Sequence, residues 1–375
     1  MRPFEHVIFE IMPKCNARCR YCPTGRANIT HQPYGETHLQ PAMLSAALSY
    51  MLEQKIISHK TVLDLFNKGE PSLHPEFQNI INIVNSFKLR FTLSTNASHP
   101  SVFDGACDFT NLDRIIFSVP GFSAESYQKN HGFDFEKIKS NIVSILKSLR
   151  DGGFTGTPIL SFHVYKYNHD EMFAAAEFAA ANGIAMHDYL AYVMDYEKLK
   201  QIVRKTMPAD ERRQVADELF LYDEDKFDKV VASAPKNYWC EYERVLVLDE
   251  QANVYPCCVV DRFVPNSTLG NLFDMKLEDI AAKKAKAPIC KECQHLNIAF
   301  ICGIMQKYRA HDINRLYGKK IIQQLPPGSR VRRLIDSCIV RSYIFAISRW
   351  GRFGYHANKF LNLKALYRFL VRKLT

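Results

Sequence analysis

Three cysteines stand close together near the start of the sequence. Cys15, Cys19 and Cys22 are separated by three and two residues, so one short loop can present three thiolates to the same metal centre. An ordinary electron-transfer iron–sulfur cluster uses four cysteines, and a centre with an open position can bind another molecule, as a three-ligand zinc site binds water. The spacing therefore predicts a 4Fe–4S cluster with one iron free for a cofactor. The alternatives are a zinc site and unligated core cysteines.

The loop resembles the CxxxCxxC signature of the radical S-adenosylmethionine (radical SAM) superfamily. Tyr21 stands just before the last cysteine, and the resemblance implies that this ring lies near the adenine of SAM. Residues 67–71, Asn-Lys-Gly-Glu-Pro, are similar to the family's GGEP motif. The resemblance implies that Gly69 belongs to the cofactor site and that Glu70 binds the methionine ammonium. Lys68 replaces the first glycine of that motif.

Three further segments resemble cofactor-binding segments of the same family. Ser94 and Asn96 belong to a stretch similar to the family's S/T-T-N-G strand end, and Ser118 to one similar to S-x-D-G. Many relatives have an arginine before a glycine, and this arginine meets the cofactor carboxylate. Here His131 or Lys129 stands in its place. The alternative is that these polar residues only form turns and caps.

The resemblance also implies the chemistry. The reduced cluster would pass one electron to the sulfonium of SAM, giving methionine and a 5′-deoxyadenosyl radical that abstracts a hydrogen atom from the substrate. The electron would come from a flavodoxin- or ferredoxin-type protein. The protein itself would orient the reactants and exclude water and oxygen.

A second set of cysteines follows later in the chain. Its members are Cys240, Cys257, Cys290 and Cys293. Taken alone, this pattern also suits tetrahedral zinc. The stretch resembles the SPASM module, or its shortened form called twitch, which implies that these four thiolates hold an auxiliary 4Fe–4S cluster. Cys258 is the alternative to Cys257. One auxiliary cluster is predicted, because Cys302 and Cys338 lack the spacing that a further cluster needs.

A cluster with four thiolate ligands transfers electrons rather than binding substrate. The leading prediction is therefore an oxidoreductase that oxidises an alcohol or sugar-like small molecule and passes an electron to the auxiliary cluster. The alternatives are modification of a peptide and redox-neutral epimerisation of a carbohydrate, in which Cys302 would donate a hydrogen atom. Because Cys15 is so near the first residue, we expect no leader-binding domain ahead of it. A zinc-binding interaction protein is the alternative outside the enzymes.

Six apolar runs rich in β-branched and aromatic residues alternate with helical stretches. The runs lie near residues 7, 62, 91, 115, 158 and 185, and the main helical stretches at 41–56, 75–87, 134–150 and 169–182. This alternation predicts an α/β fold with a parallel sheet, either an incomplete barrel or an open doubly wound sheet. The resemblance favours a partial (β/α)6 TIM-type barrel. Its active site would lie at the carboxyl ends of the strands. His163 and Asn168, after the fifth run, either face this site or pack in the core.

The predicted organisation has four parts. They are a barrel at 1–200, a helical linker at 201–235, the auxiliary-cluster domain at 236–305 and a basic tail at 306–375. The composition, 47% apolar and 23% charged, is typical of globular proteins. No apolar run reaches about 18 residues, and no export signal is evident, so we expect a cytoplasmic protein. In such a chain eleven cysteines indicate metal ligands rather than disulfides.

The formal net charge of +10 is concentrated at the end of the sequence. From Arg330 onward there are eleven Lys or Arg residues and one acid, Asp336. Projected at about 100° per residue, the apolar residues of 360–374 share one face, which predicts a basic amphipathic helix. It would pack on the barrel, contact a membrane surface through 340–375 or bind a polyanion. A nucleic acid partner is not predicted, because no recognised binding module accompanies the charge. No motif names the substrate.

Overall fold

The computed structural model describes residues 2–104, 107–222, 224–235 and 238–307. They belong to one compact unit, residues 1–310. The predicted basic helix, its membrane contact and Cys338 lie outside the described residues. Among the helices within them, none combines the length and hydrophobicity needed to cross a membrane.

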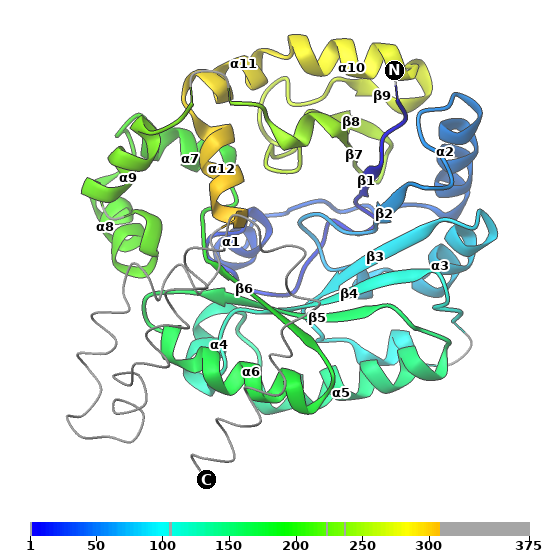
Figure 1. Ribbon diagram of the computed structural model, residues 1–375, viewed down its shortest axis with the longest axis horizontal. Helices are drawn as coiled ribbons and strands as arrows, with labels where there is room; N and C mark the ends of the chain where they lie inside the picture. The colour runs from blue at the N-terminus through cyan, green and yellow to red at the C-terminus, as the bar shows by residue number, and fades with distance from the viewer. Residues whose placement is uncertain (1, 105–106, 223, 236–237, 308–375) are drawn as a thin grey trace, which may run out of the picture. The chain divides into compact units, whose positions relative to one another are not determined.

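A single sheet runs through this unit in the strand order β6-β5-β4-β3-β2-β1-β7-β8-β9 (Figure 1). Its first six strands in sequence are parallel to their neighbours and lie where the six apolar runs predicted them. They are β1 (His6–Phe9), β2 (Val62–Asp64), β3 (Arg90–Thr95), β4 (Leu112–Val119), β5 (Thr157–Val164) and β6 (Ala185–Leu190). The predicted α/β class is confirmed. Because these strands follow one another without the reversal of order that defines a doubly wound sheet, they form a singly wound partial barrel.

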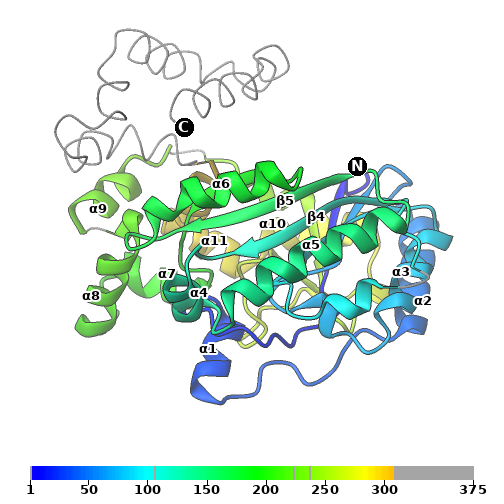
Figure 2. The ribbon, with the colours of Figure 1, turned by 90° about the horizontal axis from the view of Figure 1, so that it is seen from below.

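Helices connect these strands close to the predicted stretches. They are α1 (Pro23–Thr30), α2 (Pro41–Glu53), α3 (Phe77–Ser86), α4 (Ala124–Asn130), α5 (Phe135–Asp151) and α6 (Met172–Ala181). Figure 2 shows α4, α5 and α6 covering one face of β4 and β5. Strand residues alternate between the two faces. Phe117 and Val119 are fully buried, whereas Ser118 between them is only half-buried. Ser118 therefore points to the opposite face, which is the interior of the barrel.

The second half of the described chain extends the same sheet. β7 (Val245–Leu248) pairs in parallel with β1, and β8 (Asn253–Tyr255) and β9 (Gly270–Asn271) follow in antiparallel order. β7 and β8 form a hairpin that joins the barrel sheet directly. The division of the chain into barrel, linker and auxiliary domain stays a prediction.

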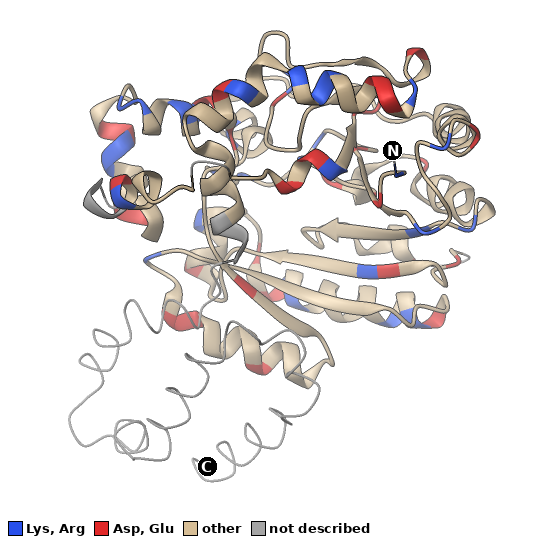
Figure 3. Cartoon of the chain, turned by 45° about the horizontal axis from the view of Figure 1, so that its top comes forward, with Lys and Arg blue, Asp and Glu red and all other residues tan. Residues whose placement is uncertain are grey.

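Helices surround this extension. α7 (Tyr196–Val203), α8 (Ala209–Glu218) and α9 (Glu224–Ala232) precede β7, and α10 (Leu277–Lys286), α11 (Pro288–His295) and α12 (Ile298–Lys307) follow β9. Tyr196 and Leu199 of α7 share a buried hydrophobic cluster with Ile298 and Ile301 of α12. Figure 3 shows Lys, Arg, Asp and Glu residues along these helices as well as on strands and loops. This packing holds α12, which carries Cys302, against α7, the first helix after β6.

Candidate cofactor and cluster sites

The first cysteine loop lies between β1 and α1. Cys22 is the N-cap residue of α1, and its N–H donates to the Cys19 carbonyl oxygen at 3.1 Å. Gly25, in the first turn of α1, packs directly on this loop, because a Cβ there would lie 2.2 Å from the same oxygen. Cys15, Cys19 and Cys22 are all partly exposed. The short helix and its glycine thus hold three thiols in one loop, as the sequence predicted.

The surroundings of Cys15 suit a metal-bound sulfur. Its Sγ accepts from the Ala17 N–H at 3.4 Å and from Asn96 Nδ2 at 3.8 Å. Burial, and then the nearby Glu70 carboxylate, raise the pKa of Cys15 to about 12. A metal centre reverses this preference for the thiol, because it binds the thiolate. Donors that point at a cluster's sulfurs also tune its reduction potential.

No three His, Cys, Asp or Glu side chains among the described residues converge as ligands of a single metal ion. A 4Fe–4S cluster spreads its thiolates around several irons. The arrangement of the three cysteines fits such a cluster.

The Glu70 carboxylate is buried, with 2% of the residue exposed, and it joins the ends of β2 and β3. Oε1 accepts from Ser72 N at 3.1 Å, from Ser72 Oγ at 2.7 Å and from Thr95 Oγ1 at 2.7 Å. Oε2 accepts from Asn96 N at 2.7 Å. Burial raises the pKa of Glu70, and these hydrogen bonds oppose the rise. Because Oε2 has one partner among the described residues, it keeps acceptor capacity for a donor from a cofactor.

Gly69 is fixed by its surroundings. A Cβ at this position would lie 1.7 Å from the Met12 carbonyl oxygen. The Gly69 N–H donates to Glu10 Oε1 at 3.0 Å, and the Lys68 N–H donates to the same oxygen at 2.8 Å. Only glycine lets the loop that carries Glu70 approach the segment before the cysteines this closely.

We expect Gly69→Ala to destabilise the protein by about 3 kcal/mol or more, because its methyl group would overlap backbone that cannot move independently. Gly183→Ala is the matched control. A Cβ on Gly183 meets no atom closer than 3.5 Å, although its φ is +69°, so this variant should lose only about 1–2 kcal/mol. Urea unfolding followed by circular dichroism measures both losses. Equal losses in the two variants would contradict the close approach at Gly69.

Tyr21 is held by a carboxylate that the sequence did not single out. Its hydroxyl donates to Glu218 Oε2 at 2.7 Å, and Arg20 Nη1 binds Glu218 Oε1 at 2.8 Å. Lys129 Nζ lies 3.3 Å from the same Oε1 and 3.7 Å from the centre of the Tyr167 ring. Glu218, at the end of α8, therefore orients Tyr21. It also forms an ion pair with Lys129, so the charge of Lys129 is balanced within the protein.

His131 is buried, with 2% exposed, and burial lowers its pKa to about 3. A neutral imidazole lacks the positive charge of the arginine whose place it was predicted to take, so it can contribute only a hydrogen bond. Among the described residues, its Nδ1 has no hydrogen-bond partner, and neither does the buried hydroxyl of Tyr127, whose ring centre lies 5.2 Å from that of His131. The Tyr127 hydroxyl lies within electrostatic reach of Cys19 and Glu70. The structure therefore places a second unpartnered polar group, the Tyr127 hydroxyl, beside His131, which the sequence predicted as a cofactor-binding residue. No sequence motif pointed to Tyr127.

The remaining predicted polar residues have different surroundings. Asn96 Nδ2 also donates to Asn16 Oδ1 at 2.9 Å, and Ser94 is half-buried on β3. Asn168 is fully buried, and its amide binds the carbonyl oxygens of Pro120 and His163. Asn168 is thus a structural residue, and Asn96 is the one among these that contacts the cysteine loop.

Polar and aromatic side chains line the barrel interior. His163 Nε2 lies 2.6 Å from Tyr189 Oη and 3.4 Å from Ser118 Oγ. Burial lowers the pKa of His163 to about 4, so the ring is neutral near pH 7. The Tyr192 ring centre lies 6.0 Å from that of Tyr189. This wall presents hydroxyl and imidazole groups from Ser118, His163 and Tyr189.

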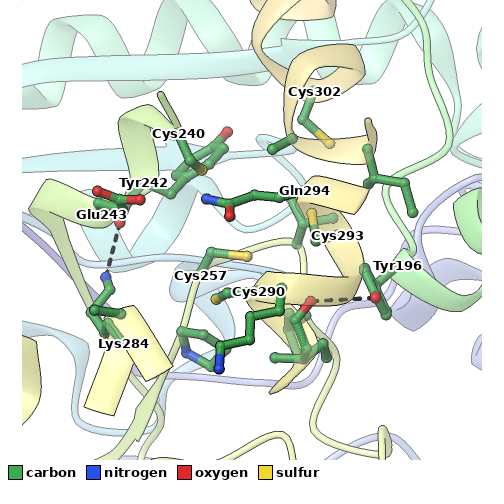
Figure 4. A pocket seen from close by; sticks show the side chains of 18 residues that line it. Tyr196, Cys240, Tyr242, Glu243, Cys257, Lys284, Cys290, Cys293, Gln294 and Cys302 are labelled. Carbon is green, nitrogen blue, oxygen red and sulfur yellow. Dashed lines mark hydrogen bonds between the residues drawn. The ribbon is translucent and has the colours of Figure 1, made fainter. Parts of the chain in front are cut away.

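The second cysteine set lines one pocket (Figure 4). Its cysteines are Cys240 before β7, Cys257 after β8, Cys290 and Cys293 on α11, and Cys302 on α12. Burial raises the pKa of Cys290 to about 12 and that of Cys293 further. The four predicted ligands thus come together from three separate segments, and Cys302 accompanies them.

Cys258 does not line this pocket. Burial raises the pKa of its thiol to about 12, whereas Lys68 and a hydrogen bond with the Tyr242 side chain lower it. The next residues are tied to the same lysine, since Lys68 Nζ donates to Val259 O at 3.2 Å and lies 3.9 Å from Asp261 Oδ2. Lys68, which replaces a glycine of the family motif, thus links the Glu70 loop to the segment after the second cysteine set.

A network of buried charges strengthens this link. Arg262 Nη2 binds Glu10 Oε2 at 3.1 Å and Glu250 Oε2 at 2.8 Å, and Glu250 also accepts from the Thr37 hydroxyl. The end of β1, the loop before α2 and the segment after β8 are therefore joined. Sequence patterns gave no sign of this network.

Residues 9–179 match the family model of the radical SAM superfamily. This stretch is a radical SAM domain. It contains the cysteine loop, Glu70 and the strand ends up to His163. The domain implies a 4Fe–4S cluster and SAM. The three thiols fit the cluster. Glu70, with its remaining acceptor capacity, and the unpartnered groups of His131 and Tyr127 fit SAM.

Two curated relatives each match part of the chain. An uncharacterised protein of Methanocaldococcus jannaschii is 26% identical over 204 residues, which are 53% of this chain and 62% of the relative. A probable GTP 3′,8-cyclase of Methanococcus aeolicus is 26% identical over 151 residues, 39% of this chain and 48% of the relative. The matches therefore span about half to three-fifths of these relatives.

Solved structures share the fold of the radical SAM domain and its extension. SuiB of Streptococcus suis bound to S-adenosylmethionine has 12% identity and a TM-score of 0.50, covering 78% of this chain and 68% of SuiB. The enzyme anSMEcpe with bound AdoMet has 14% identity and a TM-score of 0.50, covering 77% of this chain and 86% of that chain. At these identities the likeness is one of fold alone.

Proposed function

We propose that this protein is a radical SAM oxidoreductase that oxidises an alcohol or sugar-like small molecule and passes an electron to an auxiliary 4Fe–4S cluster. The observation that carries the proposal is the single pocket that Cys240, Cys257, Cys290 and Cys293 line together. Four thiolates leave no iron open for substrate, so such a cluster serves electron transfer. A second cluster of this kind is what an oxidation requires and an isomerisation does not.

In this proposal the radical SAM domain holds the first cluster through Cys15, Cys19 and Cys22. When bound, this cluster and SAM supply a 5′-deoxyadenosyl radical, with the electron coming from a flavodoxin- or ferredoxin-type donor. Glu70 binds the methionine ammonium through Oε2. Tyr21, oriented by Glu218, packs near the adenine. These residues orient the cofactor, and in this proposal the interior of the partial barrel excludes water during turnover.

The interior wall supports a neutral, hydroxylated substrate. Ser118, His163 and Tyr189 offer hydrogen-bond donors and acceptors in one cluster, and Tyr189 and Tyr192 offer aromatic faces. Removal of a hydrogen atom from a carbon that bears a hydroxyl acidifies that hydroxyl, and neutral His163 is suited to accept the proton.

Anaerobic reconstitution with iron counting tests this function, together with cleavage of SAM and a screen of cyclitols, sugars and short peptides. We expect about eight irons per chain and a two-electron oxidised product. Zinc in place of iron, or no SAM cleavage by the reduced protein, would sink the proposal. Turnover in deuterated water separates the alternatives. Deuterium on carbon that Cys302→Ala abolishes would indicate an epimerase, and a modified peptide would indicate a maturase.

We expect Cys257→Ser to lose about four irons per chain and Cys258→Ser to lose none, because only Cys257 lines the pocket with the other cysteines. The two variants are matched, since the residues are adjacent and both are partly exposed. Iron analysis and Mössbauer spectroscopy of the reconstituted variants measure the difference. Retention of the second cluster in Cys257→Ser with its loss in Cys258→Ser would assign Cys258 as the ligand.

A further inference from the structure

Three charged side chains line the pocket of the second cysteine set, and Lys284 is the buried one, whereas Glu243 and Lys291 are exposed. Lys284, on α10, is 5% exposed, and Figure 4 shows it beside Cys257 and Cys290. Its neighbours Lys283 and Lys286 are exposed. Of the three lysines of α10, only Lys284 therefore has its ammonium group in the pocket rather than in solvent.

The Lys284 ammonium has no acidic partner there. Nζ donates to the carbonyl oxygen of Tyr242 at 2.9 Å and to that of Val245. Within the described residues it forms no ion pair closer than 4 Å. Burial lowers the pKa of Lys284, and the cysteines around it, Cys257 first, oppose this change because their thiolates would be negative. A buried ammonium without a directly bonded anion is costly. The Glu243 carboxylate also lines the pocket but is exposed to solvent, so a negative charge inside the pocket would stabilise Lys284.

A 4Fe–4S cluster with four thiolate ligands supplies that charge. It is anionic when oxidised and gains a further negative charge when reduced. A buried cation beside it therefore stabilises the reduced form more than the oxidised form. Net charge and hydrogen bonding near the sulfurs are among the factors that set the reduction potential of such clusters. The buried cation therefore raises the reduction potential of the cluster, which makes the cluster a better electron acceptor.

We propose that Lys284 is the countercharge of the auxiliary cluster and raises its reduction potential, so that the cluster accepts an electron from the substrate radical. The inference rests on the proposed auxiliary cluster. Lys284 is a positioning and tuning residue, since it touches neither the substrate nor the cofactor. Its two carbonyl bonds fix the ammonium beside the turn that follows Cys240.

The test uses the full chain with Cys15, Cys19 and Cys22 replaced by alanine, so that the auxiliary cluster is the one cluster observed. A potentiometric titration followed by electron paramagnetic resonance gives its reduction potential. Lys284→Gln should lower the equilibrium constant for reduction at least tenfold, which is ~59 mV for one electron. Lys284→Met should act in the same direction. The matched control Lys283→Met, which removes an exposed lysine, and the charge-keeping Lys284→Arg should change it less than threefold.

The outcomes separate this inference from the function on which it rests. A cluster in Lys284→Gln with an unchanged potential overturns the inference and leaves the oxidoreductase proposal standing. A chain that never binds the second set of irons overturns both. If the neutral variants lose the cluster and Lys284→Arg keeps it, the requirement for charge is supported. Loss in Lys284→Arg as well would show that packing, not charge, matters.

Discussion

Simultaneous replacement of Cys15, Cys19 and Cys22 by alanine is expected to abolish cleavage of SAM and to reduce the iron content from about eight to about four atoms per chain. The three thiols lie on one loop between β1 and α1, and the other cysteine of residues 9–179 is Cys107. The second cysteine set comes from the segment before β7, the segment after β8 and α11, so its four irons should stay. Methionine release and iron analysis measure the two effects.

Cys107→Ala is the matched control for this experiment. Cys107 is buried outside both cysteine sets, and burial raises the pKa of its thiol to about 11, as expected for a structural cysteine. This variant should keep its iron and its SAM cleavage. An iron content that is the same in the triple variant and in the parent protein would contradict the assignment of the loop.

The positions of the radical-site residues followed from the sequence because parallel strands share one carboxyl edge. Hydrophobic runs predicted β1, β2 and β3, and the polar residues directly after them had to meet. Cys15, Glu70 and Asn96 do so, linked through Asn96 to both the Cys15 sulfur and the Glu70 carboxylate. Local patterning and topology together were sufficient for this part of the site.

Contacts between distant segments were not predictable in the same way. Glu218 lies in a charged helix with no distinguishing pattern, although it binds Tyr21 and Lys129. The protonation of His131 depends on burial by its neighbours rather than on its position in a motif. The pairing of β7 with β1 was equally hidden, because a hairpin pattern does not indicate which existing strand it will join.

The sequence also did not decide whether Cys257 or Cys258 is the ligand of the auxiliary cluster. Cys257 and Cys258 are adjacent just after β8, so either residue satisfies the spacing to the other cysteines. Spacing alone does not state which. The structure orients Cys257 toward the common pocket and Cys258 toward Lys68 and Tyr242.

Glu70→Gln is expected to destabilise the protein by about 2–4 kcal/mol and to weaken SAM binding at least tenfold. The carboxylate accepts four hydrogen bonds and donates none. An amide NH2 group in place of either oxygen would face an N–H or O–H donor, for example Asn96 N, and leave that buried donor unsatisfied. The same NH2 group would repel the methionine ammonium that Glu70 is proposed to bind.

Glu76→Gln is the control, because Glu76 is exposed six residues away and its side chain accepts only from Asn79 Nδ2. It should change stability by less than about 0.5 kcal/mol and leave SAM binding intact. Urea unfolding and equilibrium dialysis with labelled SAM measure the two quantities on the same samples. Normal stability with weakened SAM binding in Glu70→Gln would restrict Glu70 to the cofactor, whereas lost stability with normal SAM binding would make it purely structural. Loss of both follows from the geometry, because one carboxylate joins β2 to β3 and keeps an acceptor for the cofactor.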